Sequence, residues 1–268
     1  MSGFICPVCK CELGRKQGVY FCPKGHSFDI SKFGYVNLLM SQQSSLKRHG
    51  DDKAMVLARR GFLSKGYYQP LCDALCDVIS SNASRDSVIA DVGCGEGYYS
   101  SAIFSRTNAR FYGIDISKDA LRFASRSVPD GEFAVASAFQ LPFGDKSIDI
   151  VANVFAPSAY SEFHRIMKDA GRLIKVVPLE EHLWELKKAL YDVPYKNKPE
   201  IRNDELFNLV ESQELKYEIQ LDNQADIDNV FKMTPYYYKT GRREAERLSF
   251  LGQLTTTVHF AIEVYEKR

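Results

Sequence analysis

The sequence predicts an α/β protein with a doubly wound, mostly parallel sheet of seven strands, preceded by a small cysteine-rich module. Three observations predict this architecture. Short apolar runs alternate with helical patterns along most of the chain. A glycine-rich turn follows the first of these runs, and four of the seven cysteines fall within the first 22 residues. The composition is ordinary for a globular protein, with 45% hydrophobic and 26% charged residues.

Length and charge limit the function classes. A chain of 268 residues can form one large domain, or a large and a small one. The net charge of +1 means that any nucleic-acid-binding surface must be a local patch. There is no signal-peptide pattern and no apolar run near 18 residues, so we expect a cytoplasmic protein without a membrane partner. In that reducing setting, clustered cysteines indicate metal or redox chemistry.

The N-terminal cysteines have the spacing of a zinc site. Cys6-x2-Cys9 is followed, after twelve residues, by Cys22-x3-His26. Each pair fits one tight turn, and two facing turns provide four tetrahedral ligands. A segment this small lacks apolar material for its own core, so a structural zinc ion is expected to supply folding free energy. The alternatives are a free thiol cluster or a redox Cys-x-x-Cys, and Cys11 is the spare thiol.

Helical and β patterns then follow in order along the chain. Apolar residues at helical spacing predict two helices between residues 52 and 80, with Pro70 in the first turn of the second. Strand–helix alternation after that point is typical of parallel β-α-β units. We predict strands at 88–92, 111–114, 132–136, 148–154, 172–177, 215–221 and 255–265 and helices at 98–106, 118–126, 159–167, 181–191 and 204–212.

Three parts of the chain are expected on this basis. Residues 1–37 form the zinc-ribbon-like module, 38–82 a linker and helical segment, and 83–268 the main domain. The polar stretch 41–53 is nearly free of large hydrophobic residues, so it is either a flexible linker or a loop ordered by substrate.

The glycine-rich turn predicts a site for an adenosine-containing cofactor. The first buried strand contains Asp91 and runs into a turn with alternating glycines, Gly93, Gly95 and Gly97. Glycine lets a backbone turn sharply and approach a ligand closely. The spacing differs from the G-x-G-x-x-G of dinucleotide sites. Asp115 ends the next strand, twenty residues after Gly95, where its carboxylate can accept both ribose hydroxyls. A structural glycine turn and an NAD site are the alternatives.

This region resembles the class I S-adenosylmethionine (SAM)-dependent methyltransferases, over about residues 85–180. The resemblance implies a Rossmann-like sheet whose first loop holds the methionine moiety and whose second strand ends at the ribose. Many members carry an acidic residue in the adenine-side loop, where this chain has Ser137 and Ala138, so adenine recognition falls to backbone groups or Ser137. The residues that we assign to the cofactor here are Asp91, Gly93, Gly95, Glu96, Gly97, Asp115 and Ser137.

Further motifs resemble the bacterial 23S ribosomal RNA guanine-N1 methyltransferases over about the first 190 residues. They are the opening Cys-Pro-x-Cys, the segment 33–39, Gly50-Asp51, Ala58-Arg59-Arg60, Tyr68-x-Pro70, Phe155-Ala156-Pro157 and the segment 182–187. The resemblance implies methylation of a guanine in a 23S rRNA hairpin that lines the peptide exit tunnel, where macrolide-type antibiotics bind. It implies a zinc module that recognises RNA, and a homodimer. It also places Tyr68 and His182 beside Gly95 and Glu96 at the cofactor.

The segment after the fourth strand is where the target base is expected. The sequence from Asn153 to Pro157 loosely resembles the Asn-Pro-Pro-aromatic motif that holds the target nitrogen in amino methyltransferases. We predict Asn153, Phe155 and Pro157 as catalytic residues, with Phe155 stacking on an unpaired or flipped-out guanine for about 1–3 kcal/mol. A strand end with a turn proline is the alternative. No residue is an unambiguous general base, and Tyr160 and Glu162 are candidates.

Two groups of basic residues are candidate RNA-binding surfaces, although solvated helix faces carry such runs equally well. The first comprises Lys10, Arg15, Lys16, Lys24, Lys47, Arg48, His49, Lys53, Arg59 and Arg60. The second comprises Tyr236, Tyr237, Tyr238, Lys239, Arg242, Arg243 and Arg247. Two rival functions remain open. One is methylation of another RNA or a small molecule with a purely structural zinc module, and the other is RNA binding without turnover.

Overall fold

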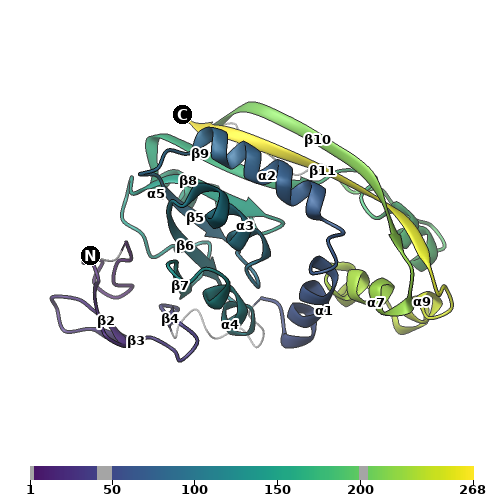
Figure 1. Cartoon of the computed structure of the whole chain (residues 1–268), viewed down its shortest axis with the longest axis horizontal. Coiled ribbons are helices and arrows are strands. Elements are labelled where there is room, and N and C mark those ends of the chain that lie inside the picture. Colours follow the sequence, from purple (N-terminus) through teal and green to yellow (C-terminus); the bar gives the residue numbers. More distant parts are fainter. Residues whose placement is uncertain (1–2, 41–49, 199–204) are drawn as a thin grey trace.

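The computed structural model describes residues 3–40, 50–198 and 205–268 (Figure 1). The helices of these residues are α1 (Lys53–Leu63), α2 (Gln69–Asn82), α3 (Tyr98–Thr107), α4 (Lys118–Ser127), α5 (Tyr160–Ile166), α6 (Trp184–Leu190), α7 (Gln224–Lys232), α8 (Tyr236–Lys239) and α9 (Arg242–Leu248). The strands are β1 (Gly14–Lys16), β2 (Val19–Phe21), β3 (Ser27–Asp29), β4 (Tyr35–Asn37), β5 (Val88–Val92), β6 (Arg110–Asp115), β7 (Glu132–Val135), β8 (Ile148–Val154), β9 (Met167–Pro178), β10 (Phe207–Leu221) and β11 (Leu254–Lys267).

The large sheet has the strand order β10-β11-β9-β8-β5-β6-β7-β4. From β9 to β4 every neighbouring pair is parallel, whereas β11 runs antiparallel to both β9 and β10. The predicted α/β class with a mostly parallel sheet is confirmed. The eighth strand, β4, was not predicted; it comes from the N-terminal segment and pairs with β7.

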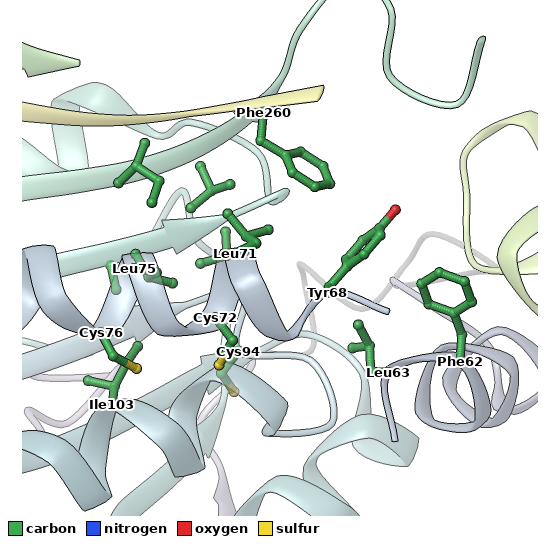
Figure 2. Packing of buried hydrophobic residues seen from close by; sticks show 14 of the residues in the cluster. Phe62, Leu63, Tyr68, Leu71, Cys72, Leu75, Cys76, Cys94, Ile103 and Phe260 are labelled. Carbon is green, nitrogen blue, oxygen red and sulfur yellow. The ribbon is translucent and has the colours of Figure 1, made fainter. Parts of the chain in front are cut away.

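The two faces of the large sheet bury separate layers of side chains. Alternate residues of β6 point to opposite faces, so that Phe111 and Tyr112 belong to different core clusters. The helices α2, α3 and α4 cover the face of Phe111, where Leu71, Leu75 and Ile103 pack together (Figure 2). The other face is covered by α5 and the N-terminal module. The sheet is therefore doubly wound, as predicted.

The N-terminal module shares its core with the large sheet. Phe4 is fully buried, and its ring centroid lies 5.8 Å from that of Tyr20 and 5.2 Å from that of Tyr112. The Tyr20 hydroxyl donates a hydrogen bond of 2.7 Å to Glu132 of β7. The backbone N–H of Ile5 donates to the carbonyl of Pro142 at 2.9 Å. The module is thus packed against the sheet, and the sheet supplies the apolar surface that the module lacks.

The predicted helix at 204–212 is wrong. From residue 207 onward this segment is the first half of β10, which pairs with β11 along its whole length. Phe207 and Leu209 face the core while Asn208 and Val210 are exposed, which is the period of a strand. A β-bulge after Leu209 interrupts this alternation, so the strand pattern cannot be read from the sequence. Pairing with a distant strand determines the conformation here.

None of the helices in the described ranges has the length and hydropathy of a bilayer-spanning segment.

Candidate functional site

The four predicted metal ligands converge in the N-terminal module. The ligand atoms of Cys6, Cys9, Cys22 and His26 all lie within 4.8 Å of one another. The Sγ atoms of Cys9 and Cys22 are 3.6 Å apart, and His26 Nδ1 lies 3.3 Å from Cys22 Sγ. Zinc bonds of roughly 2.0–2.3 Å place tetrahedral ligand atoms about 3.3–3.8 Å apart, so these two separations fit zinc. Cys11 is not part of this cluster.

The two knuckles that carry these ligands are tight turns. The backbone N–H of Lys10 donates to the carbonyl of Cys6 at 2.9 Å, and that of Gly25 donates to Cys22 at 3.0 Å. Both donor residues have positive φ, 62° at Lys10 and 85° at Gly25, which glycine adopts without strain. The backbone N–H of Cys11 lowers the pKa of the Cys9 thiol to about 7, which favours the thiolate that a metal requires.

A cavity of about 380 Å³ lies at the carboxyl ends of β5, β6 and β8. Its volume is within the usual range of small-molecule sites, roughly 300–1,000 Å³. Of the twelve residues predicted for catalysis and cofactor binding, seven line this cavity. They are Gly93, Gly95, Glu96, Asp115, Ser137, Phe155 and Pro157. The other five, which do not line it, are Tyr68, Asp91, Gly97, Asn153 and His182.

Asp115 is held at the cavity by two backbone amides. Its Oδ2 accepts a hydrogen bond from the N–H of Gly95 at 2.9 Å, and its Oδ1 accepts one from Ser117 at 2.7 Å. Burial raises the pKa of Asp115 above its usual range, and these two N–H groups oppose that rise. Each oxygen keeps a second lone pair, so the carboxylate can also accept from a vicinal diol.

The glycines of the turn have different structural roles. Gly95 has φ of 55°, and a Cβ built there meets only the Arg59 guanidinium, at 3.9 Å, so the position is open toward the cavity. A Cβ at Gly93 would lie 2.2 Å from that of Ala156, so this glycine lets the loop after β8 approach the turn. A Cβ at Gly97 would lie 2.7 Å from Ala124 Cα, so Gly97 serves the packing of α3 on α4. A turn open at Gly95 and a carboxylate at Asp115 fit the adenosine and methionine parts of SAM.

Asp91 lies beneath the turn rather than in the cavity. Its side chain is fully buried, and Oδ2 accepts a 2.6 Å hydrogen bond from the Ser100 hydroxyl of α3. Burial raises the pKa of Asp91 to about 7. Within the part of the chain that the structure describes, its Oδ1 has no hydrogen-bond partner.

Phe155 combines backbone strain with exposure at the cavity. Its φ is 53°, in the left-handed region that bulky side chains rarely enter, and such a conformation costs about 1–3 kcal/mol. The ring lines the cavity and is 43% exposed. Its centroid lies 5.2 Å from that of Phe260 and 6.4 Å from those of Tyr68 and Tyr99. A strained residue that presents an aromatic ring at a cavity is typical of a functional site.

Tyr68 and His182 are buried behind Phe155. Tyr68 lies between Phe62 and Phe260 (Figure 2), and its Oη is 3.5 Å from His182 Nε2. Burial lowers the pKa of His182 to about 3, so the ring is neutral near pH 7. Both side chains pack against Phe260, whose ring also contacts that of Phe155.

The remaining catalytic candidates have structural partners. Asn153 is 1% exposed, and its amide donates to the carbonyl of Val92 at 3.0 Å, which ties β8 to β5. Tyr160 Oη accepts from Lys175 Nζ at 2.7 Å. Glu162 pairs with Arg165 and accepts from the backbone of Leu141. Neither general-base candidate lines the cavity.

Sequence reasoning missed the contribution of α1 and the segment before it to the cavity. Gly50, Asp51 and Arg59 line it, and Arg59 forms an ion pair with Asp51. The Ser117 hydroxyl donates to the carbonyl of Asp51 at 2.7 Å, and Arg59 Nη2 donates to that of Met233 at 3.2 Å. The Gly50-Asp51 motif was a signal for this role, but Arg59 was assigned only to RNA. The predicted RNA ligands Lys47, Arg48 and His49 lie outside the described residues.

Several residues of the second basic group, between Tyr236 and Arg247, have partners within the fold. Arg247 forms an ion pair with Asp192 and also donates to the Leu190 carbonyl, and Arg242 pairs with Glu246 one turn along α9. Tyr236 packs in the core, and its hydroxyl donates to Asn197 at 3.1 Å. Packing therefore explains much of this group.

The zinc cluster yields a prediction with an internal control. The Cys22→Ser variant should lose stoichiometric zinc, because a hydroxyl is a poor zinc ligand, and its module should unfold at lower temperature. Cys11→Ser should keep about one zinc per chain, because Cys11 is outside the cluster. Metal analysis of the two purified variants beside the unaltered protein checks this. Equal zinc in both variants would remove Cys22 from the ligand set.

Two family models match this chain, one over the domain that contains the cavity and one over the zinc module. A family model described as "Methyltransferase domain" matches residues 90–176, and one described as "RlmA, N-terminal", a zinc ribbon, matches residues 4–47. The chain accordingly has a SAM-dependent methyltransferase domain and a module with one structural zinc site. A demethylmenaquinone methyltransferase of Chlorobaculum tepidum is 29% identical, but over only 42% of this chain and 49% of its own length.

Two relatives match almost the whole chain. The 23S rRNA (guanine(748)-N(1))-methyltransferase of Streptomyces fradiae is 32% identical over 96% of this chain and 95% of its own length. A Bacillus subtilis protein, YxjB, provisionally named a 23S rRNA (guanine-N(1)-)-methyltransferase, is 35% identical over 94% of this chain and 92% of its own length. With the zinc cluster and the cavity described above, this similarity shows that the chain belongs to the 23S rRNA (guanine-N1)-methyltransferase family.

Proposed function

We propose that this chain transfers the methyl group of SAM to N1 of one guanine in a 23S rRNA hairpin near the peptide exit tunnel. The observation that carries the proposal is the extent of the similarity. The relatives named for guanine-N1 methylation match the zinc module and the catalytic domain together, whereas the menaquinone-pathway relative matches less than half of the chain.

The proposed cofactor site uses the residues that line the cavity. Asp115 would accept hydrogen bonds from the ribose hydroxyls, and the backbone at Gly93 and Gly95 would bind the methionine part. Glu96 is positioned in the same turn, and Ser137 faces the cavity where adenine is expected. When bound, SAM supplies an electrophilic methyl group. Tyr68 and His182 support the Phe155 side of the cavity from behind, Tyr68 through ring contact with Phe155 and His182 through Phe260.

The target guanine would stack on Phe155. The fold presents this ring at the cavity, and the strained backbone fixes its orientation, so alignment of N1 is achieved before reaction. Pro157 lines the same wall. Asn153 acts as a positioning residue in this proposal, since its amide anchors the end of β8 to Val92.

The proposal extends to the partners and location of the chain. We propose that it acts in the cytoplasm on ribosomal RNA, with the zinc module contacting RNA, and that it forms a homodimer. Sedimentation equilibrium checks the dimer, because a monomer at micromolar concentration contradicts it.

The first test is the identity of the product. Labelled SAM and unmodified 23S rRNA fragments should give 1-methylguanosine at a single nucleotide, identified by mass spectrometry of the digested RNA. Guanine 748 is the first position to examine, because the Streptomyces fradiae relative is named for it. Methylation of a different atom, or incorporation into small molecules alone, would contradict the proposal. SAM binding without any methylated RNA would favour an RNA-binding protein that has lost turnover.

Asp115 should control cofactor affinity. Asp115→Asn removes the negative charge that the ribose hydroxyls would donate to, and we expect SAM to bind about 10- to 100-fold more weakly, in line with about 1.5–3 kcal/mol for a hydrogen bond to a charged group. Calorimetric titration with SAM measures this. Asp119→Asn on the exposed face of α4 is the matched control and should bind SAM normally. Unchanged affinity in Asp115→Asn would remove this carboxylate from the site.

Substitution of Phe155 should lower activity on RNA and leave the affinity for the cofactor unchanged. Phe155→Leu keeps apolar bulk but removes the stacking surface, so kcat/KM for the RNA should fall by about 5- to 150-fold, equivalent to about 1–3 kcal/mol of stacking. SAM affinity should change by less than about twofold. Steady-state kinetics with the hairpin measure this, and Phe250→Leu, at a ring that is 86% exposed, is the control. A loss of SAM affinity equal to the loss of kcat/KM would contradict a stacking role.

A further inference from the structure

An aromatic ring beside the zinc module collects three positive charges that the cofactor site does not use. The Phe33 ring lies in the loop before β4. Lys32 Nζ is 5.3 Å from its centroid, and the guanidinium carbons of Arg122 and Arg126 on α4 are 5.4 Å and 4.9 Å from it. The three cationic residues are exposed. Cations at such distances are attracted by the ring face.

The fold fixes this arrangement. The Ser125 hydroxyl on α4 donates to the Phe33 carbonyl at 2.7 Å, which attaches the loop to the helix. Arg122 and Arg126 are four residues apart, so they share one face of α4. The Phe33 ring thus holds both guanidinium groups near one place on the surface. A guanidinium has five N–H donors, which suit oxygen acceptors such as phosphate.

Few acidic groups balance this charge. Asp119 forms an ion pair of 3.0 Å with Arg122. In the three described ranges, no carboxylate lies within ion-pair distance of Lys32 or Arg126. Like charges one helical turn apart repel each other, so an external anion between Arg122 and Arg126 would be favourable. A polyanion would relieve this repulsion.

A fourth cationic residue, Arg60, extends the positively charged surface toward the cofactor cavity. The guanidinium of Arg60, on α1, lies 4.6 Å from the ring centroid of Phe123 on α4. Its neighbour in sequence, Arg59, lines the cavity. Burial raises the pKa of Glu96 in the glycine turn, and the charges of Arg60 and Arg59 oppose that rise, so both act at the cavity. Figure 1 shows β3, β4, α4 and α1 following one another along one edge of the molecule.

We propose that Lys32, Arg122, Arg126 and Arg60 form a binding surface for the phosphodiester backbone of RNA, leading from the zinc module to the cofactor cavity. We call these four residues the α4 track. The inference rests on the proposed function, in that RNA is the substrate, and it identifies the face of the chain that the RNA follows. Guanidinium groups suit this role because two parallel N–H donors match the oxygens of a phosphate.

The test compares two double variants of the full chain. Arg122→Gln/Arg126→Gln removes two charges of the track, and Arg85→Gln/Arg106→Gln removes two exposed charges elsewhere. Affinity for a fluorescent 23S rRNA hairpin is measured over a range of salt concentrations. Each lost phosphate contact reduces the magnitude of the slope of log K against log[salt] by about 0.7–0.9. The slope of the track variant should therefore be smaller in magnitude by about 1.5. Its KM for RNA should rise, with kcat and SAM affinity unchanged.

The outcomes separate this inference from the proposed function. Arg122→Lys/Arg126→Lys keeps both charges and should keep the slope, and unchanged SAM affinity of the glutamine variant shows that it is folded. A track variant with the slope and affinity of the control pair overturns the inference, even if the unaltered protein methylates the hairpin. If the unaltered protein does not methylate it, the proposed function fails, and the same titration with single-stranded poly(U) decides the inference. A slope smaller in magnitude by about 1.5 supports the track, and equal slopes overturn it.

Discussion

The parallel pairing of β5 with both β6 and β8 determines where this chain can bind a ligand. Because β5 lies between them, the connections that leave the carboxyl ends of these strands separate to opposite sides and open a crevice. The glycine turn is then fixed to the neighbouring strand, since the N–H groups of Gly93 and Cys94 both donate to the carbonyl of Ile114, at 2.7 Å and 3.0 Å. Asp115 follows Ile114 directly, so the pairing also sets the position of the carboxylate.

The sequence was sufficient for those parts of the fold that depend on local pattern. Strand–helix alternation and the glycine turn predicted the central parallel strands, their helices and the position of the cavity, because hydrophobic period and turn chemistry are local properties. The first half of β10 could not be predicted, since its conformation comes from pairing with β11 and its alternation is broken by a bulge. The three-residue strand β4 is too short to give a pattern.

For the functional site, too, some features could be predicted from the sequence and others could not. Residue type and spacing indicated the four metal ligands and Asp115, because each needs a particular donor atom at a particular turn. The same reasoning does not say which way a side chain points. Arg59 was assigned to RNA although it faces the cavity, and Asn153 was assigned to the target base although its amide is taken by Val92. Charge and polarity alone do not distinguish a solvent-facing side chain from one that points into the fold.

The long hairpin of β10 and β11 has a consequence for association between copies of the chain. In the described sheet, β10 is one edge, and an exposed edge of fifteen residues would invite pairing with another strand. Charged side chains at Glu211, Glu214, Lys216 and Glu218 are exposed along it, and the bulge distorts its hydrogen-bonding groups. The other edge, β4, offers three residues. Both edges are therefore protected against sheet extension and aggregation, and a dimer of this chain would have to form through side chains rather than through a continuous sheet.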